Sequence, residues 1–165
     1  MAIYNLISTV TVGSGGASSI AFTSIPQIYT DLLVVCSGRT DGSGNGINIS
    51  FNGNTSNYSS RALQGNGSGV SSFGTYNRNA GMVTDSNQTA SVFGSTSIYV
   101  PNYTGSTFKS YSADGVSEHN SATAYMSFIA GLWSDVSAIT SLTLSLMAGN
   151  FMQHSSASLY GIKNN

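Results

Sequence analysis

Short runs rich in β-branched and aromatic residues recur along the chain, separated by segments rich in Gly and Asn. The alternation typical of a half-buried strand is clearest at 47–51 and 142–146. The apolar residues that share one face of these two runs are Ile47, Ile49 and Phe51, and Leu142, Leu144 and Leu146. No segment keeps helical spacing, so the pattern predicts an all-β protein with negligible helix.

Ten strands are predicted, at 3–12, 19–23, 30–40, 46–52, 59–63, 91–100, 107–113, 123–133, 139–147 and 158–162. Such runs at this spacing favour an antiparallel β-sandwich, jelly-roll-like, with about eight to ten strands. Segments 65–72 and 76–88 are expected to be irregular loops. No linker or change of composition divides the chain, so residues 1–165 are expected to form a single domain.

The run from Leu32 to Cys36 is apolar at every position and does not alternate. A strand of this kind is expected to be covered on both faces. The opposing sheet would cover one face, and a neighbouring subunit or a loop would cover the other. Cys36 is the only cysteine, so no intramolecular disulfide is expected.

Charged residues make up only 7% of the chain, with a formal net charge of −1. The five basic residues are scattered, which argues against binding to nucleic acid or to an anionic membrane surface. The N-terminal residues lack the pattern of a secretory signal, and no run of about 20 apolar residues predicts a membrane span. We therefore expect synthesis in the cytoplasm and a polar, nearly uncharged surface suited to assembly.

Three places in the sequence carry side chains that could bind a metal ion or act in catalysis. The loop from Asp41 to Gly46 resembles the start of a calcium loop, but Asn52 stands where a bidentate Glu is needed, so a hairpin turn is the better interpretation. Glu118 and His119 are adjacent without a marked nucleophile, and we expect them in a solvated loop. His154 is interpreted as a turn residue. We expect no catalytic residue, metal site or cofactor, and hence no enzyme.

Several stretches resemble a family of small virion proteins of tailed phages, many of them from aquatic hosts. They are Ile25-Pro26-Gln27, Tyr29-Thr30-Asp31-Leu32-Leu33-Val34-Val35, Ile49-Ser50-Phe51-Asn52-Gly53, Asn57-Tyr58-Ser59-Ser60-Arg61-Ala62-Leu63, Ala138-Ile139-Thr140-Ser141-Leu142, Gly149-Asn150-Phe151 and Ser158-Leu159-Tyr160-Gly161-Ile162-Lys163. The resemblance implies a β-sandwich located in the virion, on the capsid surface or in the tail.

The function expected from this resemblance is that of a capsid decoration (cement) protein, a homotrimer that binds the major capsid protein or other virion proteins and stabilises the shell. The alternative is a tail or tail-fibre component that binds host-surface glycan. Residue types enriched at interface centres occur in and beside the two segments expected to be loops. The interface anchors predicted on this basis are Phe73, Tyr76, Arg78 and Met82.

Overall fold

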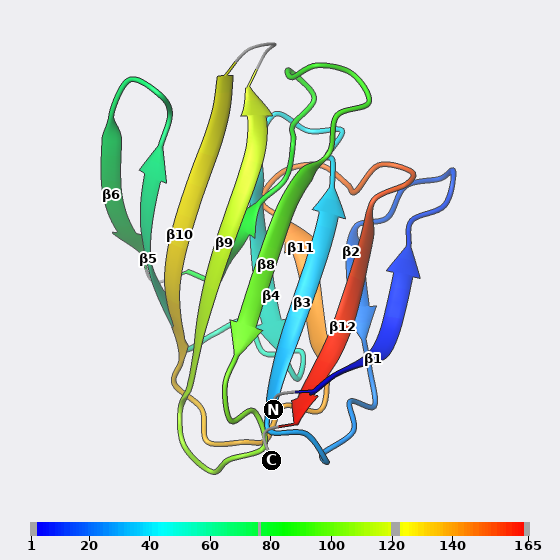
Figure 1. The fold of residues 1–165 in the computed structure, drawn as a ribbon, viewed down its shortest axis with the longest axis vertical. Helices are drawn as coiled ribbons and strands as arrows, with labels where there is room; N and C mark the ends of the chain where they lie inside the picture. The colour runs from blue at the N-terminus through cyan, green and yellow to red at the C-terminus, as the bar shows by residue number, and fades with distance from the viewer. Residues whose placement is uncertain (1–2, 76, 120–122, 164–165) are drawn as a thin grey trace.

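The computed structural model describes residues 3–75, 77–119 and 123–163. These residues form twelve β-strands in two antiparallel sheets and contain no helix (Figure 1). In sheet order, the eight-stranded sheet consists of β1 (Ile3–Thr11), β12 (Ser156–Lys163), β3 (Asp31–Gly38), β8 (Gly94–Val100), β9 (Lys109–His119), β10 (Thr123–Trp133), β5 (Tyr58–Gly65) and β6 (Val70–Thr75). The four-stranded sheet consists of β2 (Ser19–Phe22), β11 (Leu142–Leu146), β4 (Gly46–Phe51) and β7 (Asn79–Met82).

The strand order is that of a jelly roll with two added hairpins. Four strands of the large sheet, β1-β12-β3-β8, face the small sheet β2-β11-β4-β7, and successive strands of this set alternate between the sheets except β4 and β7, which are neighbours in the small sheet. The hairpins β9–β10 and β5–β6 are inserted into the chain between these strands and extend the large sheet beyond β8. The predicted antiparallel, jelly-roll-like sandwich is thus confirmed.

All ten predicted strands are present, and the structure adds β6 and β7. Both added strands lie in or beside the segments 65–72 and 76–88 that we expected to be irregular, so that expectation was wrong. Strand β7 contains no β-branched or aromatic residue, and in β6 Val70, Phe73 and Thr75 are separated by Ser and Gly, so pairing with β4 and β5 sets the conformation of both strands. Strand β9 also continues past residue 113, so Glu118 and His119 lie on a strand and not in the loop expected from the sequence.

The two alternating runs form the centre of the core. Ile47, Ile49 and Phe51 of β4 are completely buried, as are Leu142 and Leu144 of β11, whereas Leu146 is half-buried at the core margin. Removing these side chains from water is the main force that holds the two sheets together. The described residues include no helix with the length and apolar character needed to cross a membrane.

Only one face of β3 is covered within the chain. Leu32, Val34 and Cys36 point into the core, while Leu33 is half-buried and Val35 is exposed on the opposite face. No loop of the described chain covers Val35, so the expected second layer is not supplied by a loop. Burial raises the pKa of the Cys36 thiol to about 12, and the thiol is therefore protonated at neutral pH.

The added strands extend the large sheet beyond the edge of the small sheet. Strand β7, at the edge of the small sheet, packs against β8, β9 and β10, and the β5–β6 hairpin extends beyond it. Phe73 of β6 pairs with Ala62 and lies on the side of the hairpin that faces toward the small sheet. It remains 44% exposed over a cavity that it lines together with Met82 of β7.

Candidate assembly surface on the eight-stranded sheet

One face of the large sheet packs on the small sheet, and the opposite face, here called the outer face, is open. Cross-strand pairing arranges its side chains in rows that run across the strands. One row runs through Leu63, Phe128, Asp114, Ser97, Val35 and Ser158. The next row runs through Arg61, Ala130, Ser112, Tyr99, Leu33 and Tyr160.

Large apolar side chains are exposed over most of this face. Phe128 is 53% exposed and Leu63 48% exposed, side by side on β10 and β5. The other exposed apolar side chains of the outer face are Tyr4, Leu6, Val35, Tyr99, Val116, Met126 and, on β6, Val70. A sheet face on which several large apolar side chains are exposed together usually marks a contact surface. The outer face is therefore the candidate functional site.

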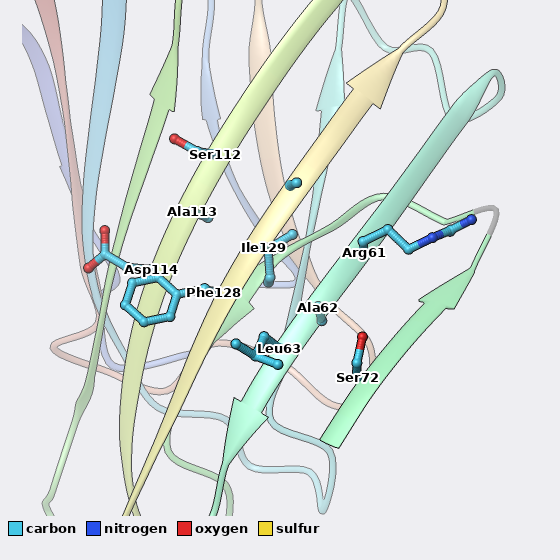
Figure 2. A pocket seen from close by; sticks show the side chains of 10 residues that line it. Arg61, Ala62, Leu63, Ser72, Ser112, Ala113, Asp114, Phe128 and Ile129 are labelled. Atoms are coloured by element: carbon cyan, nitrogen blue, oxygen red, sulfur yellow. The ribbon is translucent and has the colours of Figure 1, made fainter. Parts of the chain in front are cut away.

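A groove of about 520 Å³ crosses the outer face over β9, β10 and β5 (Figure 2). It forms where the small side chains of Ala130 and Ser112 lie beside the larger Phe128 and Leu63. Figure 2 shows Arg61 extending toward β6, away from Phe128 and Leu63. The groove thus has an apolar wall and a polar wall.

Arg61 lies flat across the neighbouring strand because Gly74 has no side chain. A Cβ atom at Gly74 would collide with the Arg61 guanidinium group. Arg61 Nη1 donates a hydrogen bond to the Ser60 carbonyl oxygen at 3.1 Å, and the side chain is otherwise exposed. A positive charge is thereby held near the free edge of the sheet.

The outer face carries little charge elsewhere. Asp114 is exposed beside Phe128, whereas Glu118 is half-buried and accepts hydrogen bonds from the amide and hydroxyl groups of Thr89 at 3.1 and 2.8 Å. Asp31 is buried at the end of β3 and accepts hydrogen bonds from the Tyr99 hydroxyl and the Asn102 amide. Few charges would need to be desolvated if a partner covered this face.

Two of the four predicted anchors meet in a second hollow, under the β5–β6 hairpin. Phe73 and Met82 both line this cavity of about 210 Å³, although Met82 is only 5% exposed and offers little surface to a partner. Arg78 is half-buried just before β7, and Tyr76 lies outside the described residues. The sequence predicted the outer face only in part, because the non-alternating run around Val35 indicated a strand with a second face for a partner to cover.

Asp41 and His154, two of the side chains considered for chemistry, line the same hollow of about 500 Å³ together with Arg39. Glu118 and His119 lie elsewhere, on β9. Asp41 accepts a hydrogen bond from the Asn150 amide at 2.6 Å, and His154 has a positive φ of 73° in a turn. The His119 ring stacks on Tyr125 at a centroid distance of 4.1 Å. Within the described residues, no three His, Cys, Asp or Glu side chains are grouped closely enough to hold a metal ion.

Comparisons with protein-family models, with curated proteins and with solved structures find no match for this chain.

Proposed function

We propose that this chain is a non-enzymatic structural protein of a tailed-phage virion, a capsid decoration protein that self-associates as a homotrimer and binds the shell. The observation that carries the proposal is the outer face, an apolar surface of the large sheet that no described part of the chain covers. The resemblance of several stretches to small phage virion proteins supports the location in the particle.

The proposed mechanism is contact area rather than chemistry. A specific protein interface buries about 800 Å² on each partner, and repeated modest contacts in a closed oligomer add up to attachment that no single contact provides. The formal net charge of −1 brings little electrostatic repulsion between copies. Bound copies would link neighbouring subunits of the major capsid protein and help the shell resist internal pressure from packaged DNA.

The location can be tested by immunogold labelling of intact particles of the encoding phage. We expect gold over the whole capsid surface, at an even density, because decoration proteins occupy every equivalent position of the shell. Antibody against the major capsid protein provides the control for access to the capsid. Label confined to the tail, or absent from particles that contain the capsid protein, would contradict the proposal.

The cavity under the β5–β6 hairpin favours a second candidate function, a tail or tail-fibre component that binds host-surface glycan. Amide side chains of Gln64 and Asn77 line the cavity beside Phe73, and its described lining carries no charged residue. The Ser127 hydroxyl, also in the lining, is buried and has no hydrogen-bond partner among the residues that the structure describes. Amides and an unpaired hydroxyl suit sugar hydroxyl groups, and an aromatic ring offers a stacking surface.

Titration of the purified chain with neutral monosaccharides, followed by NMR, tests this second candidate. Saturable shifts that disappear in Phe73→Ala but persist in Phe128→Ala would support it, because Phe128 lies on the opposite face of the sheet. The absence of saturable shifts across the panel would remove it.

A further inference from the structure

We propose that the outer face of one copy is covered by the β5–β6 hairpin, and the surface next to it, of a second copy, so that copies join head to tail in a closed ring. This inference deepens the proposed function, because it names the partner of the same face. Two features of the chain support it: the size and apolar character of the outer face, and the exposed apolar side chains of the β5–β6 hairpin.

The first feature is the size and character of the outer face. Outside the β5–β6 hairpin, six strands about 4.8 Å apart, each with about nine residues at 3.3 Å per residue, give a face of about 850 Å². This area equals what one partner contributes to a stable protein interface. Phe128 and Val35 lie along one row of this face, with Asp114 and Ser97 between them. The exposed apolar side chains therefore gather in two groups, Val116, Met126 and Phe128 on β9 and β10, and Tyr4, Leu6, Val35 and Tyr99 on β1, β3 and β8.

The second feature is the β5–β6 hairpin, which exposes apolar side chains on both of its faces. Val70 is 73% exposed on the side of the outer face, and Phe73 is 44% exposed on the opposite side. A hairpin that leaves both residues in water gains little from its own packing. Burial of both in an interface would remove this apolar area from solvent.

Strand β6 is also an edge of the large sheet, and its own residues carry no feature that hinders pairing with another strand. It contains no charged residue and no proline, and its pairing with β5 is regular from Val70 to Thr75. The opposite edge, β1, has a bulge between Leu6 and Ser8, which is one of the devices that prevent edge-to-edge pairing. Apart from the Arg61 side chain of β5, which lies across Gly74, β6 carries none of these devices, so this edge is open to contact with a second copy.

The two features differ in shape and lie on different parts of one chain, so the contact between them is heterologous. A heterologous contact leaves a free face and a free hairpin unless the copies close into a ring. A ring of three satisfies every copy and agrees with the trimer that the resemblance implies. Strand β6 itself carries no charged residue, and the one charge close to it among the described residues is Arg61 of β5, which lies across Gly74 and would have to keep contact with solvent or with Asp114 of the second copy.

Two double variants separate the two sides of the contact. The face variant carries Val35→Lys and Phe128→Lys, and the hairpin variant carries Val70→Lys and Phe73→Lys. All four positions are exposed, so the changes should leave the fold intact, which far-UV circular dichroism and thermal melting verify. Val136→Lys provides the matched control, because Val136 is 55% exposed and lies outside both features.

Light scattering after size-exclusion chromatography measures the mass of each sample without any phage particle. We expect the wild type and the Val136→Lys control at three times the 17.1 kDa of one chain, and each double variant at the mass of one chain. An equal mixture of the face and hairpin variants should form dimers, because the intact hairpin of one variant fits the intact face of the other. Only a heterologous contact predicts this partial rescue.

A wild type that stays monomeric at all concentrations would overturn the inference, as would a trimer that persists in either double variant. A mixture that remains monomeric would overturn the head-to-tail arrangement. A monomeric wild type that immunogold still locates over the capsid would leave the decoration role standing and remove only the contact between copies.

Discussion

Replacing Trp133 with alanine is expected to lower the free energy of unfolding by about 3–5 kcal/mol, the range found for truncating large buried aromatic residues. Trp133 is 1% exposed at the end of β10. Its ring lies 5.5 Å from Phe51 and 6.1 Å from Tyr58, measured between centroids. The Tyr58 hydroxyl in turn accepts a hydrogen bond from the Phe51 amide at 2.8 Å. This cluster joins the added hairpins to the small sheet, so its loss should loosen both.

Trp133→Phe provides the matched control for this prediction. It keeps an aromatic ring in the cluster and removes the Trp133 Nε1 donor, which is buried without a hydrogen-bond partner among the described residues. We therefore expect it to cost less than half as much as Trp133→Ala. Urea denaturation followed by far-UV circular dichroism measures both. A loss below about 1 kcal/mol for Trp133→Ala would show that the cluster is not packed as described.

Replacing Arg39 with methionine is expected to lower the free energy of unfolding by about 1–3 kcal/mol, because three part-buried carbonyl groups would lose their donors. Arg39 is 6% exposed, and its guanidinium group donates hydrogen bonds to the carbonyl oxygens of Gln88, Thr89 and Val92 at 2.8 to 3.1 Å. One side chain thus anchors the loop between β7 and β8. Methionine keeps the length of the apolar stem and removes the donors, so the change reports on the hydrogen bonds.

Arg61→Met is the control for Arg39→Met, since Arg61 is exposed and makes one local hydrogen bond to a backbone carbonyl. It should change the free energy of unfolding by less than about 0.5 kcal/mol. Amide hydrogen exchange adds a local measurement, in which Arg39→Met should lose protection at Val92 and its neighbours. Equal effects of the two substitutions would contradict the anchoring role of Arg39.

The sequence was sufficient to predict the strands whose own residues favour a half-buried sheet. Alternation in β4 and β11 identified core residues correctly because a two-residue period leaves only one way to face the small sheet. Strand β7 was missed because its small and polar residues adopt strand geometry only through its partner, and β6 was missed because Ser and Gly residues interrupt its β-branched and aromatic residues. The pairing of β5 with β10 could not be predicted from the sequence either, because it joins residues such as Leu63 and Phe128 that are far apart along the chain.

The candidate site was predicted in part. The non-alternating run around Val35 indicated a strand with two apolar faces, and the structure leaves its second face open to a partner. Strand β10 also has apolar residues on both faces, since Met126 and Phe128 point outward while Ile129 points inward. The prediction from the sequence did not include this strand. Conversely, Met82 was chosen as an anchor by residue type alone, and the packing of β7 against the large sheet buries it.

The central claim, that this chain decorates the capsid of a tailed phage, is tested most directly by its copy number in purified particles of the encoding phage. Quantitative mass spectrometry, with the major capsid protein as the internal reference, gives this number. The account predicts hundreds of copies per particle, in a fixed ratio to the capsid protein, because a decoration protein occupies every equivalent position of the shell. A few copies to some dozens, in proportion to tail proteins, or no copies at all, would contradict it.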